Sequence, residues 1–298
     1  MVLNCVKLIS VFVFTVLELK ADGSLVHVPG PNGDPAQLQF EELQKDLCMK
    51  NMTYAAHFRT AGGEDHVYFA SEGCDTNGSV IASKFDRTTG HLTMLSQSDA
   101  GGCATCFVAL PSHGKHLFCA NYLGTIAAFP RNEDGSLGKR SDLVRFPLPQ
   151  HELLFQPFPR KNEARQEDTH PHMSILNRDE TKLLVPDLGL DVVWSVDYAQ
   201  SAQADDCLSV SAMPAARNEL VQGAGPRHIV LHPKLPVAYV LYEMGSLVVA
   251  YPTSEDGIPG DVPLARPVPT LNEECGVFEG KSFDAHDTER YICAHVVP

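Results

Sequence analysis

The chain has 298 residues, 44% of them hydrophobic, which is enough for two ordinary domains or for one large repetitive domain with a substantial core. It carries 37 acidic and 23 basic residues, and this net charge of -14 excludes broad attraction to nucleic acid or to an anionic membrane. An anionic substrate would therefore need a locally basic pocket.

The nine cysteines are odd in number and lack the paired spacing of a disulfide framework or a zinc site. The one suggestive pair, Cys103 and Cys106, has no partner pair along the chain, so we expect neither a metal site nor redox chemistry there. This cysteine pattern favours a reducing, cytoplasmic location.

An apolar run over residues 8–17 follows Lys7 near the N-terminus. It resembles the hydrophobic region of a signal peptide and is too short to span a bilayer. Because the run is rich in β-branched and aromatic residues and leads into an acidic-glycine turn, we predict a β-strand, with a signal peptide as the alternative. Further along, residues 35–50 are predicted to form the one helix, because their leucines give a partly amphipathic face.

A unit of about 45–50 residues recurs along the chain, as expected for propeller blades of three to four strands. Each copy has an apolar strand, a polar turn, a second apolar strand that ends in a polar residue, a third strand and a closing turn. The clearest copy spans residues 106–137, and the irregular stretch 147–168 is predicted to be an inserted loop. These short strands and abundant Gly and Pro turns predict an all-β fold, with one β-propeller domain over residues 1–298.

Polar residues end the second strand in four copies of the unit, at Glu72, Asn121, Asp187 and Glu243. Because strand ends and loops of a propeller surround a central channel, such residues are able to converge at its mouth. The alternative is that they only form turns and caps, and for Asn121 the two interpretations have equal weight. For Glu243, a carboxylate at the end of an apolar run favours function.

Two further residues, His172 and Arg227, each stand just before the first strand of a copy, so we expect both to face the same end of the channel. With Glu243 they bring together an imidazole that accepts a proton, a guanidinium that binds an anion, and a carboxylate that orients them. Alone, such a His is usually a cap and such an Arg is usually on the surface. The predicted catalytic residues are His172, Arg227 and Glu243, and the predicted substrate-binding residues are Asn121, Asp187 and His228.

Several segments, in this order, resemble the lactonase family of seven-bladed β-propellers, which includes 6-phosphogluconolactonases and carboxy-muconate cyclases. The segments that carry the resemblance are Ala120–Tyr122, Asp134–Leu137, Arg165–Met173, Pro186–Asp191, Gly225–His228 and Tyr239–Glu243. The resemblance implies a seven-bladed propeller with an active site at the channel mouth, whose His, Arg and Glu fall on His172, Arg227 and Glu243. A further Arg that the family uses in a later blade has no counterpart here, so we expect the last one or two blades to be missing.

The function implied by this resemblance is hydrolysis of a sugar-derived lactone such as 6-phosphogluconolactone. His172 would activate water, Glu243 would orient or relay the proton, and Arg227 would bind the phosphate or the developing oxyanion. We expect no cofactor and no metal, a small anionic lactone as the partner, and no nucleic-acid or membrane partner, while the oligomeric state stays open. The alternatives are a lactonising cycloisomerase of the carboxy-muconate type and a catalytically silent propeller that serves as a binding scaffold.

Overall fold

The fold is described from a computed structural model of the chain. It describes residues 52–73, 77–146, 165–200, 207–209 and 221–270, and the backbone of the strands within 2–8, 11–19, 25–27 and 214–216. The helix predicted over 35–50 lies outside the described residues. So does most of the loop predicted over 147–168, of which residues 165–168 are described as turns and bends.

The N-terminal strands form a three-stranded antiparallel sheet, in which β2 pairs with both β1 and β3. These strands are β1 (Val2–Leu8), β2 (Val11–Leu19) and β3 (Leu25–His27). Since β2 covers most of the apolar run over residues 8–17, the prediction of a strand there is confirmed. In the part of the chain that the structure describes, no helix is long and apolar enough to cross a membrane.

Four further antiparallel sheets follow in the chain, which we call blades I to IV. Blade I contains β4 (Met52–Arg59), β5 (Asp65–Ser71), β6 (Ser79–Phe85) and β7 (Leu92–Asp99). Blade II contains β8 (Thr105–Ala109), β9 (His116–Asn121), β10 (Thr125–Pro130) and β11 (Asp142–Arg145). Blade III contains β12 (Ile175–Leu176), β13 (Lys182–Asp187), β14 (Val192–Tyr198), β15 (Leu208–Ser209) and β16 (Pro214–Ala216). Blade IV contains β17 (Pro226–Leu231), β18 (Val237–Tyr242), β19 (Leu247–Pro252) and β20 (Val268–Pro269).

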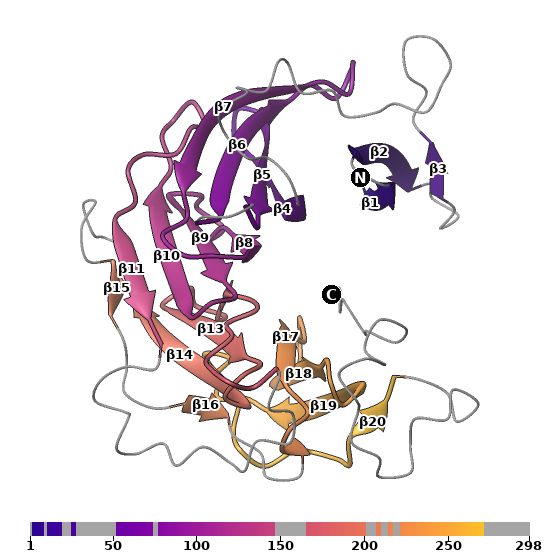
Figure 1. Cartoon of the computed structure of the whole chain (residues 1–298), viewed down its shortest axis with the longest axis vertical. Coiled ribbons are helices and arrows are strands. Elements are labelled where there is room, and N and C mark those ends of the chain that lie inside the picture. Colours follow the sequence, from indigo (N-terminus) through magenta and orange to yellow (C-terminus); the bar gives the residue numbers. More distant parts are fainter. Residues whose placement is uncertain are drawn as a thin grey trace.

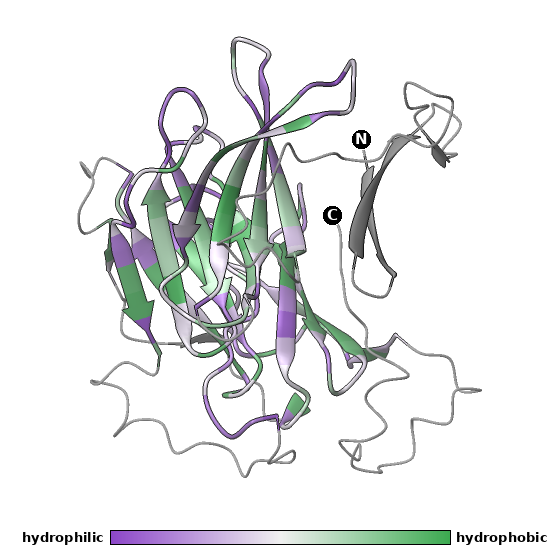
Figure 2. Cartoon of the chain, turned by 45° about the horizontal axis from the view of Figure 1, so that its top comes forward, coloured by the Kyte–Doolittle hydropathy of each residue, from purple (hydrophilic) through white to green (hydrophobic). Residues whose placement is uncertain are grey.

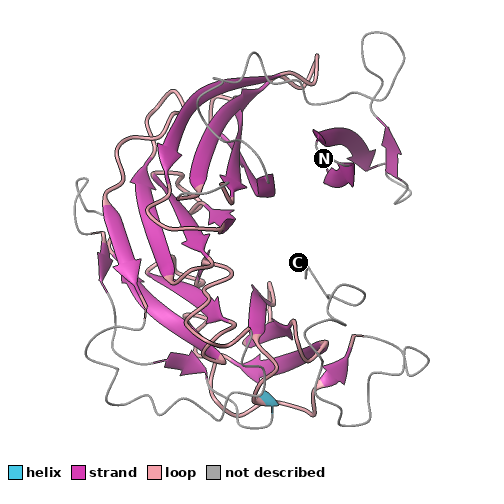
Figure 3. Cartoon of the chain, in the orientation of Figure 1, coloured by secondary structure: helices cyan, strands magenta, loops and turns pink. Residues whose placement is uncertain are grey.

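The blades stand side by side along an arc around a common centre (Figure 1). The first strands β4, β8 and β17 lie toward that centre, and later strands such as β7 and β11 lie toward the outside (Figure 1). Strands and loops make up the blades (Figure 3). This arrangement confirms the predicted all-β propeller architecture and places the loops at both ends of the inner strands around the channel.

The second and third strands are buried along almost their whole length in blades I to III, whereas β19 of blade IV is largely half-buried. Every residue of β5 and of β9 is buried, whereas β7 and β11 each have a single buried residue and are otherwise half-buried or exposed. Hydrophobic residues accordingly concentrate in the strands and hydrophilic ones in the loops (Figure 2). An outer strand needs only one apolar face, so its hydrophobic pattern in the sequence is weak.

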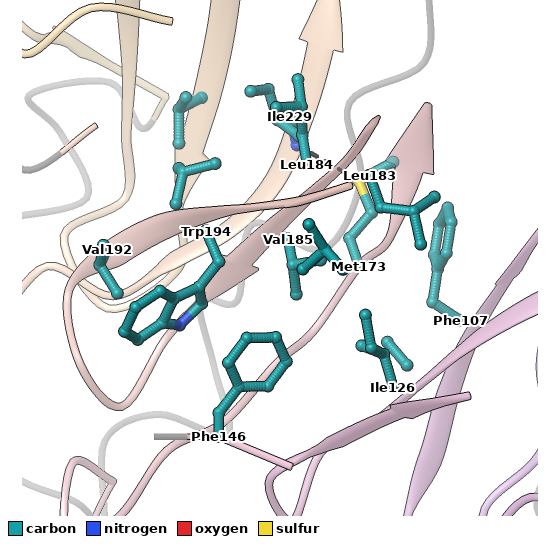
Figure 4. Close-up of a cluster of buried hydrophobic side chains, with 14 of the residues drawn as sticks. Phe107, Ile126, Phe146, Met173, Leu183, Leu184, Val185, Val192, Trp194 and Ile229 are labelled. Atoms are coloured by element: carbon teal, nitrogen blue, oxygen red, sulfur yellow. Dashed lines mark hydrogen bonds between the residues drawn. The ribbon is translucent and has the colours of Figure 1, made fainter. Parts of the chain in front are cut away.

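The largest buried cluster joins blades II, III and IV across their facing sheets. Figure 4 shows Phe107 and Ile126 of blade II close to Met173 and Val185 of blade III, with Ile229 of blade IV on the other side. Trp194 is 1% exposed and stacks on Phe146, with the ring centroids 5.3 Å apart. Apolar packing between neighbouring sheets therefore helps to hold the blades together, since the hydrogen bonds of the strand ladders run within each sheet.

A buried polar contact between His116 and Tyr198 accompanies this packing at the junction of blades II and III. The Tyr198 hydroxyl lies 2.8 Å from Nδ1 of His116, and the Tyr198 ring makes an edge contact with Phe118 at 4.9 Å between centroids. His116 is 3% exposed, and burial lowers its pKa. A buried imidazole nitrogen needs a hydrogen-bond partner, and the tyrosine hydroxyl supplies it. This hydrogen bond fixes how the two blades pack, which apolar contacts alone do less strictly.

The substitution Tyr198→Phe is expected to lower the free energy of unfolding by about 1–3 kcal/mol, because it leaves Nδ1 of the buried His116 without its partner while keeping the ring. Urea unfolding of the parent and the variant, followed by far-ultraviolet circular dichroism, measures this difference. An unchanged unfolding midpoint would contradict a role for the hydroxyl at the blade junction.

Candidate active site

The four polar residues at the strand ends occupy two different register positions, which corrects the expectation that they are equivalent. Asn121 pairs with Thr105 and Asp187 pairs with Pro171, whereas the residue at this position in blade IV is Tyr242, which pairs with Pro226. Glu243 is therefore one residue further along, at the position of Tyr122 in blade II. Because side chains alternate between faces, this shift of one residue places Asn121 and Asp187 inside their blades and lets Tyr122 and Glu243 meet outside them.

Asn121 and Asp187, two of the predicted substrate-binding residues, use their polar atoms within their own blades, and both are 0% exposed. The Asn121 amide donates to the Ala100 carbonyl and the Thr125 hydroxyl, and its oxygen accepts from the Thr105 hydroxyl. Asp187 accepts from the indole of Trp194, a hydroxyl and three backbone N–H groups. Burial raises the pKa of Asp187 although these donors oppose the rise. The contacts support a structural role for both residues, as in the turn-and-cap interpretation.

The first strands of blades I, II and IV contain a β-bulge at matching positions, and Arg227 lies in one of them. The register shifts between Met52 and Tyr54, between Thr105 and Phe107, and between Pro226 and His228. In blade III the corresponding residue is His172, which follows the bridge between Pro171 and Asp187. His172 and Arg227 thus occupy equivalent positions, although Arg227 lies within β17 and not before it. A bulge leaves one residue outside the ladder and re-aims its side chain, as is common beside active sites.

Glu243 accepts hydrogen bonds from two guanidinium groups. Arg165 Nη2 donates to Oε1 at 2.9 Å, and Arg227 Nη1 donates to Oε2. The Glu243 side chain is 3% exposed, whereas those of Arg165 and Arg227 are 26% and 17% exposed. Two cations thus share one buried carboxylate at this point of an acidic chain. Guanidinium groups arranged in this way are able to bind an anionic group.

His172 lies beside this cluster and is 7% exposed. Burial, followed by the charge of Arg227, lowers the pKa of His172 well below the ordinary value of 6.5. Its ring makes edge contacts with Tyr122 at 5.8 Å and with His228 at 5.6 Å between centroids. Nδ1 of His172 is buried and makes no hydrogen bond to another described residue. The structure therefore holds a neutral imidazole with an unpaired buried nitrogen next to two guanidinium groups.

His228, the third predicted substrate-binding residue, is 2% exposed and contacts the edges of Phe107 and His172. It therefore packs against the imidazole of His172, and the predicted contact with substrate stays a prediction. His170 is also buried, with its ring stacked on Tyr122 at 4.2 Å and its Nε2 3.0 Å from the carboxylate of Glu167. Both histidines help to fix the aromatic surroundings of the candidate site.

Arg165 and Tyr122 are site residues that the sequence reasoning did not select. The Tyr122 hydroxyl accepts from Nε and Nη2 of Arg165, both at 3.2 Å, and it joins blade II to the pair of Arg165 and Glu243. Both residues stand in segments that resemble the lactonase family, and this was the available signal. Arg165 lies between two copies of the repeat, at the end of the predicted loop, so the periodicity gave it no position.

Of the isolated cysteine pair, Cys106 has the surroundings of a structural residue. Cys106 is buried, and its thiol lies close to the backbone carbonyls of Ala120, Pro171 and His172. Burial raises its pKa far above the ordinary range, so the thiol is not a nucleophile. Within the described ranges, no three His, Cys, Asp or Glu side chains are grouped so that they could hold a metal ion.

An apolar cavity of about 620 Å³ lies among the inner strands, away from the charged cluster. Its walls include Phe58, Phe107, Met173 and Ile229, and none of the candidate catalytic residues lines it. The lining along these strands is therefore mostly apolar, with His57, Arg59 and Ser112 as polar members, and the charged cluster at Glu243 lies outside it.

Known proteins with similar sequences show the family to which this chain is related. A family model described as "Lactonase, 7-bladed beta-propeller" matches residues 22–285. A protein of Bacillus subtilis named 6-phosphogluconolactonase is 28% identical over 202 residues, which are 67% of this chain and 51% of the relative. A protein of Formosa agariphila with the same name is 25% identical over 59% of this chain and 46% of the relative. The chain spans about half the length of these curated relatives.

Solved structures agree on the fold. The periplasmic gluconolactonase PpgL of Pseudomonas aeruginosa superposes with a TM-score of 0.61, with 21% sequence identity, over 87% of this chain and 64% of that protein. At this identity the likeness concerns the propeller architecture alone.

The substitution Glu243→Gln is expected to lower the free energy of unfolding by roughly 2–3 kcal/mol. It leaves two neighbouring cations without their shared anion, and the partial exposure of the arginines keeps the loss at the low end for a broken buried pair. Urea unfolding measures it, with Glu167→Gln as the matched control, because Glu167 is 54% exposed in its pair with His170. Equal effects of the two substitutions would contradict the central role of Glu243.

Proposed function

The chain belongs to the lactonase family of seven-bladed β-propellers, and on this premise we propose that it hydrolyses a sugar-derived lactone, with 6-phosphogluconolactone as the substrate. One observation carries the proposal: a buried, neutral His172 lies beside two arginines that share Glu243. Two curated relatives are named 6-phosphogluconolactonase, which favours this substrate over a carboxymuconate.

In the proposed reaction His172 is the general base. It accepts a proton from a water molecule whose oxygen attacks the lactone carbonyl carbon, and the carbonyl oxygen gains negative charge. The bond between this carbon and the ring oxygen then breaks, and the ring oxygen takes up the proton from the imidazole. The products are a carboxylic acid, which ionises, and a hydroxyl group, so the reaction needs no cofactor.

The two arginines supply the positive charge in this proposal. A guanidinium group binds a phosphate or carboxylate through parallel N–H donors and also stabilises an oxyanion as it forms. We assign these tasks to Arg227 and Arg165 together. Glu243 accepts hydrogen bonds from both arginines and so orients them. Its position between the two guanidinium groups favours this role over that of a proton relay.

A reducing, cytoplasmic location belongs to the same proposal. Four described cysteines are free thiols, namely Cys103, Cys106, Cys119 and Cys207. Three of them are buried, and free buried thiols are typical of proteins that do not rely on disulfides for stability.

The substitution His172→Ala is expected to lower the rate of lactone hydrolysis by about 10²–10⁴-fold, because it removes the general base. Acid release from 6-phosphogluconolactone, corrected for spontaneous hydrolysis, measures the rate. The substitution His91→Ala, in the turn between β6 and β7, serves as the control and is expected to leave the rate unchanged.

Three outcomes would count against this proposal. Hydrolysis by His172→Ala as fast as by the parent would remove the base from the mechanism. Turnover of a carboxymuconate in preference to the phosphorylated lactone would favour a cycloisomerase. A folded parent chain that does not exceed the spontaneous rate would overturn the lactonase function and leave a binding scaffold.

The acidic side of the pH profile tests the state of His172. Since burial lowers the pKa of His172 well below 6.5, the imidazole stays neutral as the pH falls through 6.5. The value of kcat/KM is therefore expected to hold at pH 6.5 and to decline only at lower pH, as His172 becomes protonated. Rates measured between about pH 4 and 7, with circular dichroism to confirm folding, give the profile. A decline centred at or above pH 6.5 would contradict this environment.

A further inference from the structure

Asp191 is a buried carboxylate outside the cluster of charged site residues. It is the last residue of the turn between β13 and β14, and it is 9% exposed. Its φ angle of 52° lies in the left-handed region, which Asp and Asn tolerate better than other residues with a side chain. Burial raises its pKa although three donors oppose the rise. A carboxylate kept here at such a cost calls for a physical explanation.

The three donors to Asp191 come from two segments that carry the site arginines. Oδ2 accepts from Nε2 of Gln166 at 2.8 Å and from the backbone N–H of Gly223 at 2.7 Å. Oδ1 accepts from the backbone N–H of Gly225 at 2.9 Å. Gln166 directly follows Arg165, and Gly225 stands two residues before Arg227. One carboxylate therefore holds both segments.

The backbone around this carboxylate leaves little room for other arrangements. A Cβ atom at Gly225 would lie 2.7 Å from Cε of Met244 and 2.9 Å from Cγ of Leu188, and the φ angle there is 65°. The carbonyl of Gly225 accepts from the N–H of Glu243 at 2.9 Å. The segment that leads into Arg227 is thus fixed on one side by Asp191 and on the other by the backbone of Glu243.

We propose that Asp191 is a positioning residue, which holds the segments of Arg165 and Arg227 so that both guanidinium groups meet on Glu243. It does not touch the reacting atoms in this proposal and acts through the two arginines. Its effect on hydrolysis rests on the proposed lactonase function, whereas its effect on the placement of the arginines does not.

The substitution Asp191→Asn tests this with little change in shape or backbone preference. Whichever way the new amide turns, its NH₂ group faces a donor, and at least one of the N–H groups of Gly223 and Gly225 loses its acceptor. We expect kcat/KM to fall about 10- to 100-fold, the loss that a misplacement of about 1 Å causes.

A double-mutant cycle separates positioning from general stability. If Asp191 acts through Arg227, then Asp191→Asn lowers kcat/KM much less in an Arg227→Ala background than in the parent. The same fold-loss in both backgrounds would overturn the proposal, because a purely structural defect adds to the loss of Arg227.

A second readout does not depend on activity. The Nε–Hε signals of Arg165 and Arg227 in nuclear magnetic resonance spectra of the full chain are assigned through Arg165→Lys and Arg227→Lys. In Asp191→Asn we expect the Arg227 signal to shift or broaden, and in Gln166→Ala the Arg165 signal. The control is Asp142→Asn, which changes a carboxylate that accepts from the N–H of Cys207 between blades II and III.

The outcomes distinguish the two proposals. Arginine signals that stay in place in folded Asp191→Asn would overturn the positioning role, whatever the chain hydrolyses. Moved arginine signals in a chain without lactonase activity would support the positioning role and overturn the proposed function. Equal shifts in Asp142→Asn would show that the signals report general loosening and would overturn the specific link. Should Asp191→Asn not fold, Gln166→Ala tests the half of the link that reaches Arg165.

Discussion

Glu243 shares its carboxylate between two guanidinium groups that come from separate segments of the chain, and the arrangement of the candidate site follows from this contact. Arg165 precedes blade III, Arg227 lies in the first strand of blade IV, and Glu243 follows the second strand of that blade. Two cations so close together and partly withdrawn from water would repel each other without a shared anion. The same contact holds Arg227 near His172, and burial followed by the charge of Arg227 lowers the pKa of the imidazole well below 6.5.

A shift of one residue along the strands separates the polar residues that support the blades from those that meet at the channel. Asn121 and Asp187 are the last residues of β9 and β13, and they bind donors of their own blades. Tyr122 and Glu243 are one position further and meet at Arg165. The period of two in a β-strand thus assigns neighbouring residues to different tasks, one to the stability of the blade and the next to the chemistry of the site.

The sequence predicted the blades but not the register of the strands within them. The repeat predicted the blades, and it predicted that His172 and Arg227 are equivalent, because apolar strands and polar ends recur with the period of the fold. It did not predict the register: the polar residue is the paired one at Asn121 and Asp187, whereas in blade IV it follows the paired Tyr242, and the repeat alone grouped Glu243 with the other two. Arg165 and Tyr122 were missed as site residues because their roles depend on contacts between separate segments, which no local pattern records.

The bulge in the inner strands has a consequence for how such a protein can change over evolutionary time. The matching positions carry Thr53 in blade I, Cys106 in blade II, His172 in blade III and Arg227 in blade IV. These side chains differ in size and charge, yet in each blade the residue before them pairs with the end of the second strand. A residue that the pairing register skips contributes only backbone atoms to the sheet, so its side chain can be exchanged without loss of strand pairing. New chemistry can therefore arise at one mouth of the channel by single substitutions, while the repeated framework that carries it stays the same.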